Sequence, residues 1–537
     1  MALSIPSRKQ PGPESFPTQP DDVRDWLTTL HPLGSTDNCR ALHRGLKHSN
    51  RLETENGNRA AIASLFEPAI EEAVSTLQAE FLDQSQPLPP KAEQYRQLAL
   101  DVLSEQTFQY KIIVHDTYAS LTERQPQFRN QGIFKALRSL ASLIECHLVS
   151  QSEPDPVLMH DANTLFDLAE KGGIHRSAIA TEEGDSANEW TIEHAFIYVQ
   201  LLAMSQPWNQ RQRQIPALIN FLQQRVTSLS ITSYDAAREH STDSVFGIQL
   251  TQIGHPQPLK HTPRQPVESL RLLDIGPLLA GISEAHKRTP DSINNFFEID
   301  GLTRSGLNLL REALDRKNQR KYARAITRKS VHSEIGLRHI TAAVRFASET
   351  GGDLGTPELA AATNYWPQTP IHRQRRWVVT NENRFGACLE WLDNEPTDAA
   401  VGEVIALKRN NRDAEPSWVT GIVRWLKSIA PDRLQVGIEF LAGNTTATRI
   451  LHTVDELTTR HEGVCANLLP GVLPDHSREV LITPPTLFRH GDEVSADQKP
   501  LVLGEKILAT SGFDMFGYEE RALEQSDTDQ QPDASAG

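Results

Sequence analysis

The feature that most constrains the fold is an alternation of side chains in two neighbouring segments, 418–426 and 434–440. In the second segment every other residue is large and apolar, and the residues between are Gln, Gly and Glu. A period of two is typical of a β-strand with one face in a core. The polar turn at 429–433 joins the segments, so the sequence predicts an antiparallel β-hairpin. The side chains expected to face the core are Ile422, Val436 and Ile438.

Shorter β patterns precede this hairpin. Apolar runs predict strands at 377–379, 387–391 and 403–407. The polar segment 381–386 lies between the first two. About five or six short antiparallel strands within roughly 75 residues are typical of a small barrel or sandwich. We therefore predict a small antiparallel β-barrel over 366–445.

The residues after this barrel also show sequence patterns typical of β-strands. Short strands are predicted at 479–482, 486–489, 501–503 and 506–509. We therefore expect a second small β module at 446–520. Acidic residues among Gln, Ser and Gly follow it, and they predict a disordered acidic tail at 521–537.

The first half of the chain has the period of an α-helix. Apolar side chains recur at spacings of three and four, which places them on one face of a helix. Helices are predicted at 70–81, 134–148, 191–204 and 215–226. Short polar connections between such helices are typical of a bundle, which we place at 21–226. The leader at 1–20 is rich in Pro, Ser and Gln and is expected to be disordered.

The pattern between the bundle and the barrel, at 227–365, is mixed α/β. Residues 228–233 and 244–252 predict short strands, and 303–348 predicts a return to helix. A run of Lys and Arg at 316–329 would make this a basic helix. That run is either a solvated helix face, which is the usual case, or a docking surface for an acidic partner or a nucleotide.

The length of 537 residues exceeds what one hydrophobic core usually organises, so roughly two to four domains are expected. The predicted fold class is multidomain α+β: an N-terminal helical bundle, then a small antiparallel β-barrel and a second small β module. The net charge of −15 argues against a protein that coats DNA or RNA, because phosphate neutralisation needs a basic surface. It leaves room for a local basic pocket that binds a small anion.

The sequence carries no sign of export or of a membrane span. Its four cysteines lie far apart and match no metal-ligand spacing, so we expect buried free thiols. The N-terminal residues lack the apolar core of a signal peptide. The longest apolar stretch, around 195–204, falls short of the roughly 20 residues that cross a bilayer. The expected location is the cytoplasm.

Catalytic and metal-binding motifs are missing from the sequence. His461, Glu462 and Cys465 lie near one another, but no H-E-x-x-H or C-x-x-C accompanies them. No G-x-S-x-G motif, Walker A loop or kinase set occurs either. The sequence therefore gives no reason to propose an enzyme, a cofactor or a metal site.

Two segments resemble a known family. GIVRWLKSIAPDRLQVGIEFL at 421–441 resembles the closing hairpin of PilZ domains, in which a G-x-V-x-W strand leads to a V-G-V-E-F strand. TNENRFGACLEW at 380–391 resembles the PilZ loop Asp/Asn-x-Ser-x-x-Gly and the strand after it. Arginines lie just upstream, where the family has an Arg-x-x-x-Arg pair. The resemblance covers about 370–442 and implies a PilZ-like β-barrel of the kind that senses cyclic di-GMP.

The resemblance also assigns site residues. Arginines suit cyclic di-GMP because a guanidinium can pair with phosphate through two hydrogen bonds and can stack on a base. Asparagine side chains present both a donor and an acceptor to a guanine edge, and glycine permits a tight turn. Asn383 stands where the family has Ser, and two residues rather than three separate the outer arginines. The candidate ligand-binding residues are Arg373, Arg375, Arg376, Asn381, Asn383 and Gly386.

The sequence thus predicts a regulatory protein that binds cyclic di-GMP and changes how its helical region meets an unidentified protein partner. The alternative is an adaptor or structural protein whose degenerate PilZ-like barrel only makes protein contacts, and an enzyme in the helical half ranks third. No DNA or RNA partner is expected. Because the basic run precedes the arginines closely, we expect the nucleotide to change hydrogen exchange in 310–376 as well as in 377–390.

Overall fold

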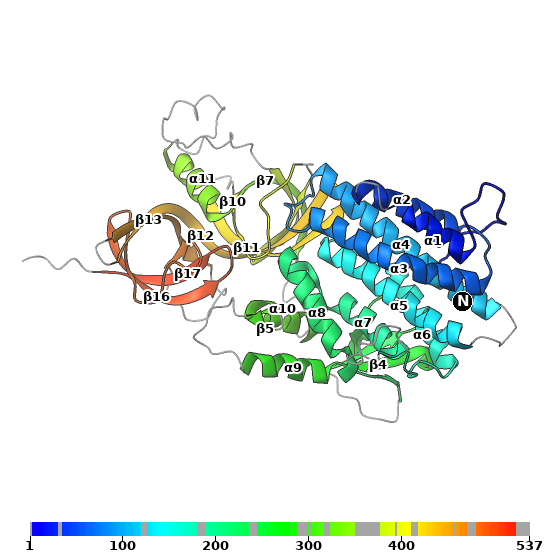
Figure 1. Ribbon diagram of the computed structural model, residues 1–537. Helices are drawn as coiled ribbons and strands as arrows, with labels where there is room; N and C mark the ends of the chain where they lie inside the picture. The colour runs from blue at the N-terminus through cyan, green and yellow to red at the C-terminus, as the bar shows by residue number, and fades with distance from the viewer. Residues whose placement is uncertain are drawn as a thin grey trace, which may run out of the picture. The chain divides into compact units, whose positions relative to one another are not determined.

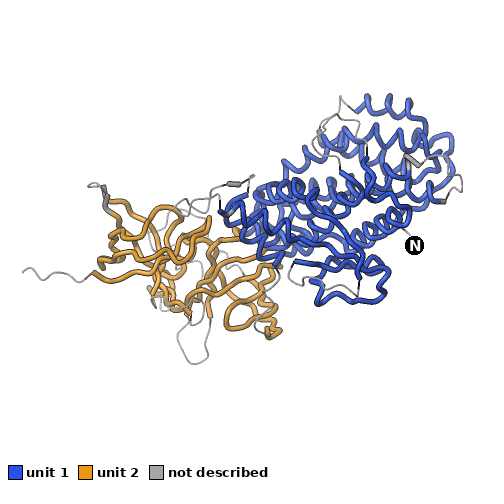
Figure 2. Tube along the Cα trace, turned by 90° about the horizontal axis from the view of Figure 1, so that it is seen from below, with its two compact units in different colours: residues 1–322, 393–397, 426–434 blue, residues 323–392, 398–425, 435–537 orange. Residues whose placement is uncertain are grey.

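The structure, a computed structural model, divides into two compact units, which Figure 2 shows in different colours. Unit 1 comprises residues 1–322, 393–397 and 426–434, and unit 2 comprises residues 323–392, 398–425 and 435–537. The residues described are 3–30, 35–119, 126–179, 190–235, 244–287, 298–299, 302–315, 323–349, 376–392, 395–409, 417–454, 457–469 and 479–521.

The N-terminal part of unit 1 is helical, and its long helices lie side by side in Figure 1. The helices are α1 (Pro20–Thr28), α2 (Ser35–Asn50), α3 (Asn56–Phe81), α4 (Pro90–Ala119), α5 (Pro126–Val149), α6 (Pro156–Lys171), α7 (Ile192–Met204) and α8 (Ile215–Arg225). The predicted helical bundle is confirmed, and the four predicted helices overlap α3, α5, α7 and α8, of which α3 begins well before the predicted residue 70. Ile70 and Phe81, which set the predicted spacing in α3, are both buried in the core.

Local signals fix where several of these helices begin. A proline occupies the first turn of α1, α6 and α8, where its missing N–H is not needed. Thr191 caps α7: its hydroxyl accepts from the His194 backbone N–H at 3.2 Å, and the His194 ring accepts from the Thr191 N–H at 3.2 Å. Most residues of α7 are buried, so its apolar run is a core helix. None of the described helices combines the length and apolarity that crossing a bilayer requires.

The residues before α1 have defined partners. Ser4 donates its backbone N–H and its hydroxyl to Asp161, at 3.2 and 2.6 Å. The Lys111 ammonium, also buried, donates to the Ser4 hydroxyl at 2.9 Å and to Asp161 at 2.7 Å. The expectation of a disordered leader is therefore wrong for residues 3–19. A composition rich in Pro and Ser rules out regular structure, whereas buried charges that need extra hydrogen bonds can still order such a segment.

A small mixed part completes unit 1. Its four-stranded sheet has the order β1-β4-β2-β3. The elements are β1 (Ile231–Ser233), β2 (Val245–Gln249), β3 (Gln257–Pro258), β4 (Leu270–Asp274), α9 (Gly276–Lys287) and α10 (Arg304–Asp315), with a separate pair, β5 (Glu298–Ile299) and β6 (Leu302–Thr303). Strands β1 and β2 fall within the two segments predicted as strands.

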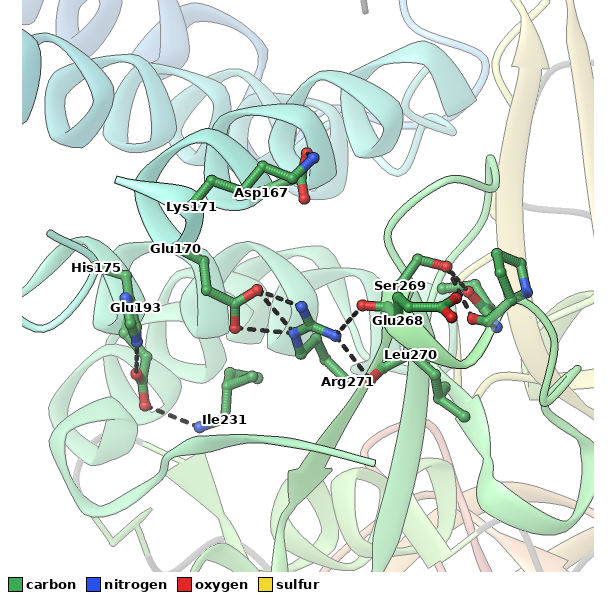
Figure 3. A network of polar contacts seen from close by, with 12 residues as sticks. Asp167, Glu170, Lys171, His175, Glu193, Ile231, Glu268, Ser269, Leu270 and Arg271 are labelled. Carbon is green, nitrogen blue, oxygen red and sulfur yellow. Dashed lines mark hydrogen bonds and ion pairs between the residues drawn. The ribbon is translucent and has the colours of Figure 1, made fainter. Parts of the chain in front are cut away.

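Charged hydrogen bonds hold this sheet to the helices, as Figure 3 shows. The Nε atom of Arg271 in β4 lies 2.8 and 2.9 Å from the two carboxylate oxygens of Glu170 in α6, and the side chains are only 11% and 20% exposed. Glu193 in α7 accepts from the backbone N–H of Ile231 in β1 at 2.8 Å. It also accepts from Arg176 at 2.8 Å. Such charge-assisted bonds are about twice as strong as neutral ones, so they fix the sheet against α6 and α7.

Unit 2 is dominated by one 11-stranded sheet that closes on itself twice. The order is β11-β10-β7-β8-β9-β12-β13-β14-β17-β16-β15, with β11 also pairing with β12 and β12 also pairing with β15. The elements are β7 (Ala325–Ile335), α11 (Leu337–Glu349), β8 (Arg376–Asn383), β9 (Gly386–Trp391), β10 (Val404–Arg409), β11 (Ser417–Ala430), β12 (Arg433–Val454), β13 (Leu457–Leu468), β14 (Glu479–Thr483), β15 (Glu493–Ala496), β16 (Lys499–Ala509) and β17 (Asp514–Glu520). The two closures make two small antiparallel barrels.

Strand β12 belongs to both barrels. Its first half runs beside β9 and β11, and its second half pairs with β13 and β15. Between the halves the register shifts from Gly443 to Thr446, and Asn444 has a φ of 51°. Such a bulge bends a strand and re-aims its side chains, which lets one strand serve two barrels. The predicted barrel and second β module are therefore both present, and strand β12 is common to the two.

The predicted hairpin is confirmed. Strands β11 and β12 pair and are joined by Pro431 and Asp432. The three side chains predicted to face the core are buried: Ile422, Val436 and Ile438.

Other local predictions were wrong. The segment 325–335 is strand β7 rather than a basic helix, and the rest of the basic run, 316–322, lies outside the described residues. Pairing with β8 and β10 overrides the local helical pattern, because tertiary contacts outweigh weak propensity. The strand predicted at 486–489 is a turn, and β15 follows it at Glu493. The tail at 522–537 is outside the described residues.

The tip of the β11–β12 hairpin belongs to unit 1. The Ser428 backbone N–H donates to the Gln151 carbonyl at 2.9 Å, just after α5. The Lys427 ammonium pairs with Glu153 and lies 5.4 Å from the centre of the Trp208 ring. A cavity of about 540 Å³ lies beside the tip and is lined mainly by α4 and by residues 428–431. The chain thus passes from unit 2 into unit 1 and back within one hairpin.

Candidate ligand-binding site

The loop between β8 and β9 is shaped by one asparagine. The Asn383 side-chain oxygen accepts hydrogen bonds from the backbone N–H groups of Phe385, at 2.9 Å, and Gly386, at 3.0 Å. An asparagine that bonds to the backbone two and three residues ahead stabilises a tight turn. We call residues 381–386 the asparagine loop. Asn383 therefore has a structural role in the loop, and its side-chain oxygen is already engaged.

Gly386 holds this loop against β12. A Cβ atom at this position would stand 2.2 Å from the Ile438 carbonyl oxygen, which no side chain could tolerate. Next to it, the Phe440 backbone N–H donates to the Phe385 carbonyl at 2.8 Å. The glycine is thus required by the close approach of two strands rather than by an unusual φ angle.

Asn381 connects the loop to the segment before β7. Its side-chain oxygen accepts from the Arg324 guanidinium at 2.9 Å. In the β7–β8 ladder Asn381 stands opposite Ile326, so the chain direction brings the start of β7 to the loop. The motif predicted Asn381 but not Arg324, which lies far upstream. The only sequence feature that pointed to Arg324 was the basic run at 316–329, and the end of that run forms part of β7.

Several charged side chains lie near the loop. Glu382 lies between the Lys329 ammonium of β7, at 3.7 Å, and the Arg409 guanidinium of β10, at 3.9 Å. The Arg409 guanidinium also lies 4.8 Å from the centre of the Phe440 ring, and that of Arg384 lies 4.4 Å from Phe385. We call four cations the basic rim: Arg324, Lys329, Arg384 and Arg409. Strands β7 and β10, the residue before β7 and the asparagine loop thus place positive charge near the Glu382 carboxylate.

The arginines predicted for the site lie at the start of β8 and in the sequence just before it. Arg376 is the first residue of β8 and stands opposite His332 in the ladder, but its side chain is not described. Arg373 and Arg375 lie outside the described residues. The structure therefore brings together Asn381, Asn383 and Gly386, and it leaves the position of the three arginine side chains untested.

Two tryptophans support the hairpin that carries the loop. Trp377 of β8 and Trp391 of β9 are direct ladder partners, and their rings lie 5.2 Å apart. Both are buried, Trp377 completely. This packing anchors the far end of the hairpin in the barrel core, so the loop projects from a rigid base. Across the part of the chain that the structure describes, no group of three or more His, Cys, Asp or Glu residues could hold a metal ion.

Comparison with known proteins gives two domain matches. Residues 21–237 match the family described as the N-terminal domain of the cyclic-di-GMP receptor FimW. Residues 355–447 match the family described as the middle PilZ domain of the same receptor. The first match covers the helical bundle, and the second covers the asparagine loop and the β11–β12 hairpin. The recognition of a PilZ domain from the sequence is confirmed.

One relative matches almost the whole chain. The protein named cyclic-di-GMP receptor FimW, from Pseudomonas aeruginosa, is 22% identical over 585 aligned positions, which cover 96% of this chain and 93% of the relative. The α+β architecture, with a helical N-terminal region and a closed six-stranded barrel, agrees with these matches. The chain is therefore a homologue of FimW that contains a PilZ domain at 355–447.

Proposed function

We propose that this protein is a cyclic di-GMP-responsive regulator that works by binding and not by catalysis, in the cytoplasm. The observation that carries the proposal is the asparagine loop, which projects from a closed PilZ barrel and is surrounded by the basic rim. The FimW relative, a named cyclic-di-GMP receptor, supports the same ligand. The alternative, an adaptor with a degenerate barrel, is not favoured by these matches.

The chemistry of the site suits a ligand with two phosphates and two purines. Arg373 and Arg375, which precede β8 in the sequence, and Arg376, its first residue, are proposed to clamp the phosphates and stack on the bases. Asn381 presents an amide to a guanine edge. Asn383 and Gly386 act by shaping the loop, since the first holds the turn and the second its contact with β12.

The β11–β12 hairpin offers a route from the ligand to the helical unit. Its base contacts the asparagine loop through Ile438 and Phe440 in unit 2, and its tip contacts Gln151 and Glu153 within unit 1. A ligand shifts such a system only if it binds two arrangements with different affinities. A partner that prefers one arrangement must then change nucleotide affinity by the same factor.

The decisive test is isothermal titration of the full chain with cyclic di-GMP, followed by hydrogen exchange with and without the nucleotide. We expect saturable binding and protection in 377–390, with further changes in 310–376 and in the tip, 426–434. The Lys427→Ala variant removes the ion pair to Glu153 and should reduce the response of the tip. Protection confined to 377–390 would mean a passive pocket. No binding at high micromolar nucleotide would favour the adaptor.

A further inference from the structure

Glu382 occupies an unusual place in the site. It is an acidic residue at the end of β8, within the asparagine loop, beside a ligand that would carry two negative charges. Its side chain is 31% exposed, and among the described residues its carboxylate lies 3.7 Å from the Lys329 ammonium and 3.9 Å from the Arg409 guanidinium. Both distances exceed the usual range for a hydrogen bond. The carboxylate oxygens therefore keep the capacity to accept hydrogen bonds from a ligand.

The two cations beside Glu382 are held weakly. The Lys329 side chain is 74% exposed and that of Arg409 is 42% exposed. Exposed ion pairs without hydrogen-bond contact contribute little to stability, so both cations can exchange partners at little cost. They come from β7, which pairs with β8, and from β10, the next strand on the far side of β7. A ligand at the loop could therefore draw them onto its phosphates and leave the carboxylate uncovered.

We propose that Glu382 is a specificity-determining residue that accepts two hydrogen bonds from the Watson–Crick edge of a guanine, while Lys329 and Arg409 move onto the phosphates. This inference rests on the proposed function. Guanine presents two adjacent donors on that edge, the N1–H and the exocyclic N2 amine, and a carboxylate has two acceptors in matching geometry. Adenine presents an acceptor at N1, which a carboxylate repels.

Charge balance fits the same exchange. In the free protein two cations neutralise one carboxylate, and in the complex two cations meet two phosphates while the carboxylate meets neutral donors. A site built to hydrogen-bond one base rejects an analogue that leaves its polar groups unpaired. Glu382 therefore raises affinity for a cyclic dinucleotide that carries guanine and lowers it for one that does not.

The test compares cyclic di-GMP with cyclic di-AMP on the full chain. Wild type should prefer cyclic di-GMP, and Glu382→Gln should bind it about tenfold or more weakly, because a charged hydrogen bond is lost. The variant should also lose most of its discrimination between the two ligands. Glu382→Asp keeps the charge and should keep the preference. If Glu382→Gln binds both ligands more tightly by the same factor, Glu382 only repels phosphate, and the inference is wrong.

Two further variants separate the roles of the cations. The double variant Lys329→Ala/Arg409→Ala should weaken both ligands by a similar factor and keep the preference for guanine. The control is Lys499→Ala, which removes an exposed lysine 3.3 Å from Glu520 on the second barrel and should leave both affinities unchanged. Equal binding by wild type and the double variant would remove the cations from the site. Failure of wild type to bind either ligand would instead reject the proposed function itself.

Discussion

The Gly386 backbone lies so close to Ile438 that a Cβ atom would stand 2.2 Å from the Ile438 carbonyl oxygen. This contact joins the asparagine loop to the strand that continues into both barrels and into the hairpin tip. Because of this contact, the loop packs directly against a strand of the barrel. Binding at the loop is therefore mechanically tied to β12.

Replacing this glycine should destabilise unit 2. Gly386→Ala forces the two strands apart, and we expect a loss of about 1–3 kcal/mol in the free energy of unfolding, as for overpacked sites. Chemical denaturation of the variant and of the wild type measures this loss of stability. Gly57→Ala is the control, because a Cβ at that position in α3 meets nothing within 4 Å, and alanine is the better helix former. Equal effects of the two variants would mean that β12 can move away from the loop without cost.

The arginines before β8 should carry much of the affinity. Arg373→Ala or Arg376→Ala should each weaken cyclic di-GMP binding by roughly 1.5–3 kcal/mol, the range for hydrogen bonds to charged groups. Titration calorimetry on the full chain gives the value. If a double variant binds as well as wild type, these residues do not belong to the site.

Arg324 should contribute as well, through its bond to Asn381. We expect Arg324→Ala to weaken the nucleotide by about 1–2 kcal/mol, because the loop loses a fixed donor and a nearby positive charge. Arg338→Ala is the control, since it removes an exposed arginine from the surface of α11. Identical affinities for the two variants would show that the segment before β7 plays no part in binding.

The ion pair between Arg271 and Glu170 should matter for unit 1. Both side chains are largely buried and the guanidinium contacts both carboxylate oxygens, so Arg271→Ala should cost about 2–4 kcal/mol. Arg24→Ala removes an exposed pair with Asp21 in α1, whose side chains are 58% and 87% exposed. That control should change stability by less than about 0.5 kcal/mol. Thermal unfolding of both variants measures the two losses of stability, and equal losses would contradict the prediction.

His147 should make unit 1 sensitive to acid. Burial, and then the positive charge of Arg96, lower the pKa of the His147 ring to about 4. The unfolded chain takes up the proton near its ordinary pKa of 6.5, so the free energy of unfolding should fall as the pH drops from 6.5 to about 4. The loss is at most roughly 3 kcal/mol, and less because the ring is only partly buried. His147→Gln should show a shallower pH dependence, and an identical slope would contradict this assignment.

The sequence predicted the parts of this fold that depend on local patterns. The helical spacing around Ile70 and the alternation around Val436 both led to the right elements. In each case the apolar side chains lie on one face of the element, and that face packs against the core. The role of 325–335 was not predictable in this way, since it becomes a strand only by pairing with segments far along the chain. The same holds for Arg324 and Glu382, whose neighbours come from three strands. Motif spacing found Asn381, Asn383 and Gly386, yet it could not reveal that Asn383 serves the turn.

The strand that runs through both barrels has a consequence for how unit 2 can fold and be divided. Each barrel is closed by a pairing of β12: the first half of the strand pairs with β11, and the second half pairs with β15. Neither barrel is closed without its half of β12. A cut at the predicted boundary near residue 445 would pass through the bulge between Gly443 and Thr446 and divide β12 between the two barrels. The predicted first barrel, 366–445, would also lack β7, so β8 and β10 would each be left with an unpaired edge. A fragment that keeps the first barrel closed must therefore begin before β7, and one that keeps both barrels must contain the whole of β12.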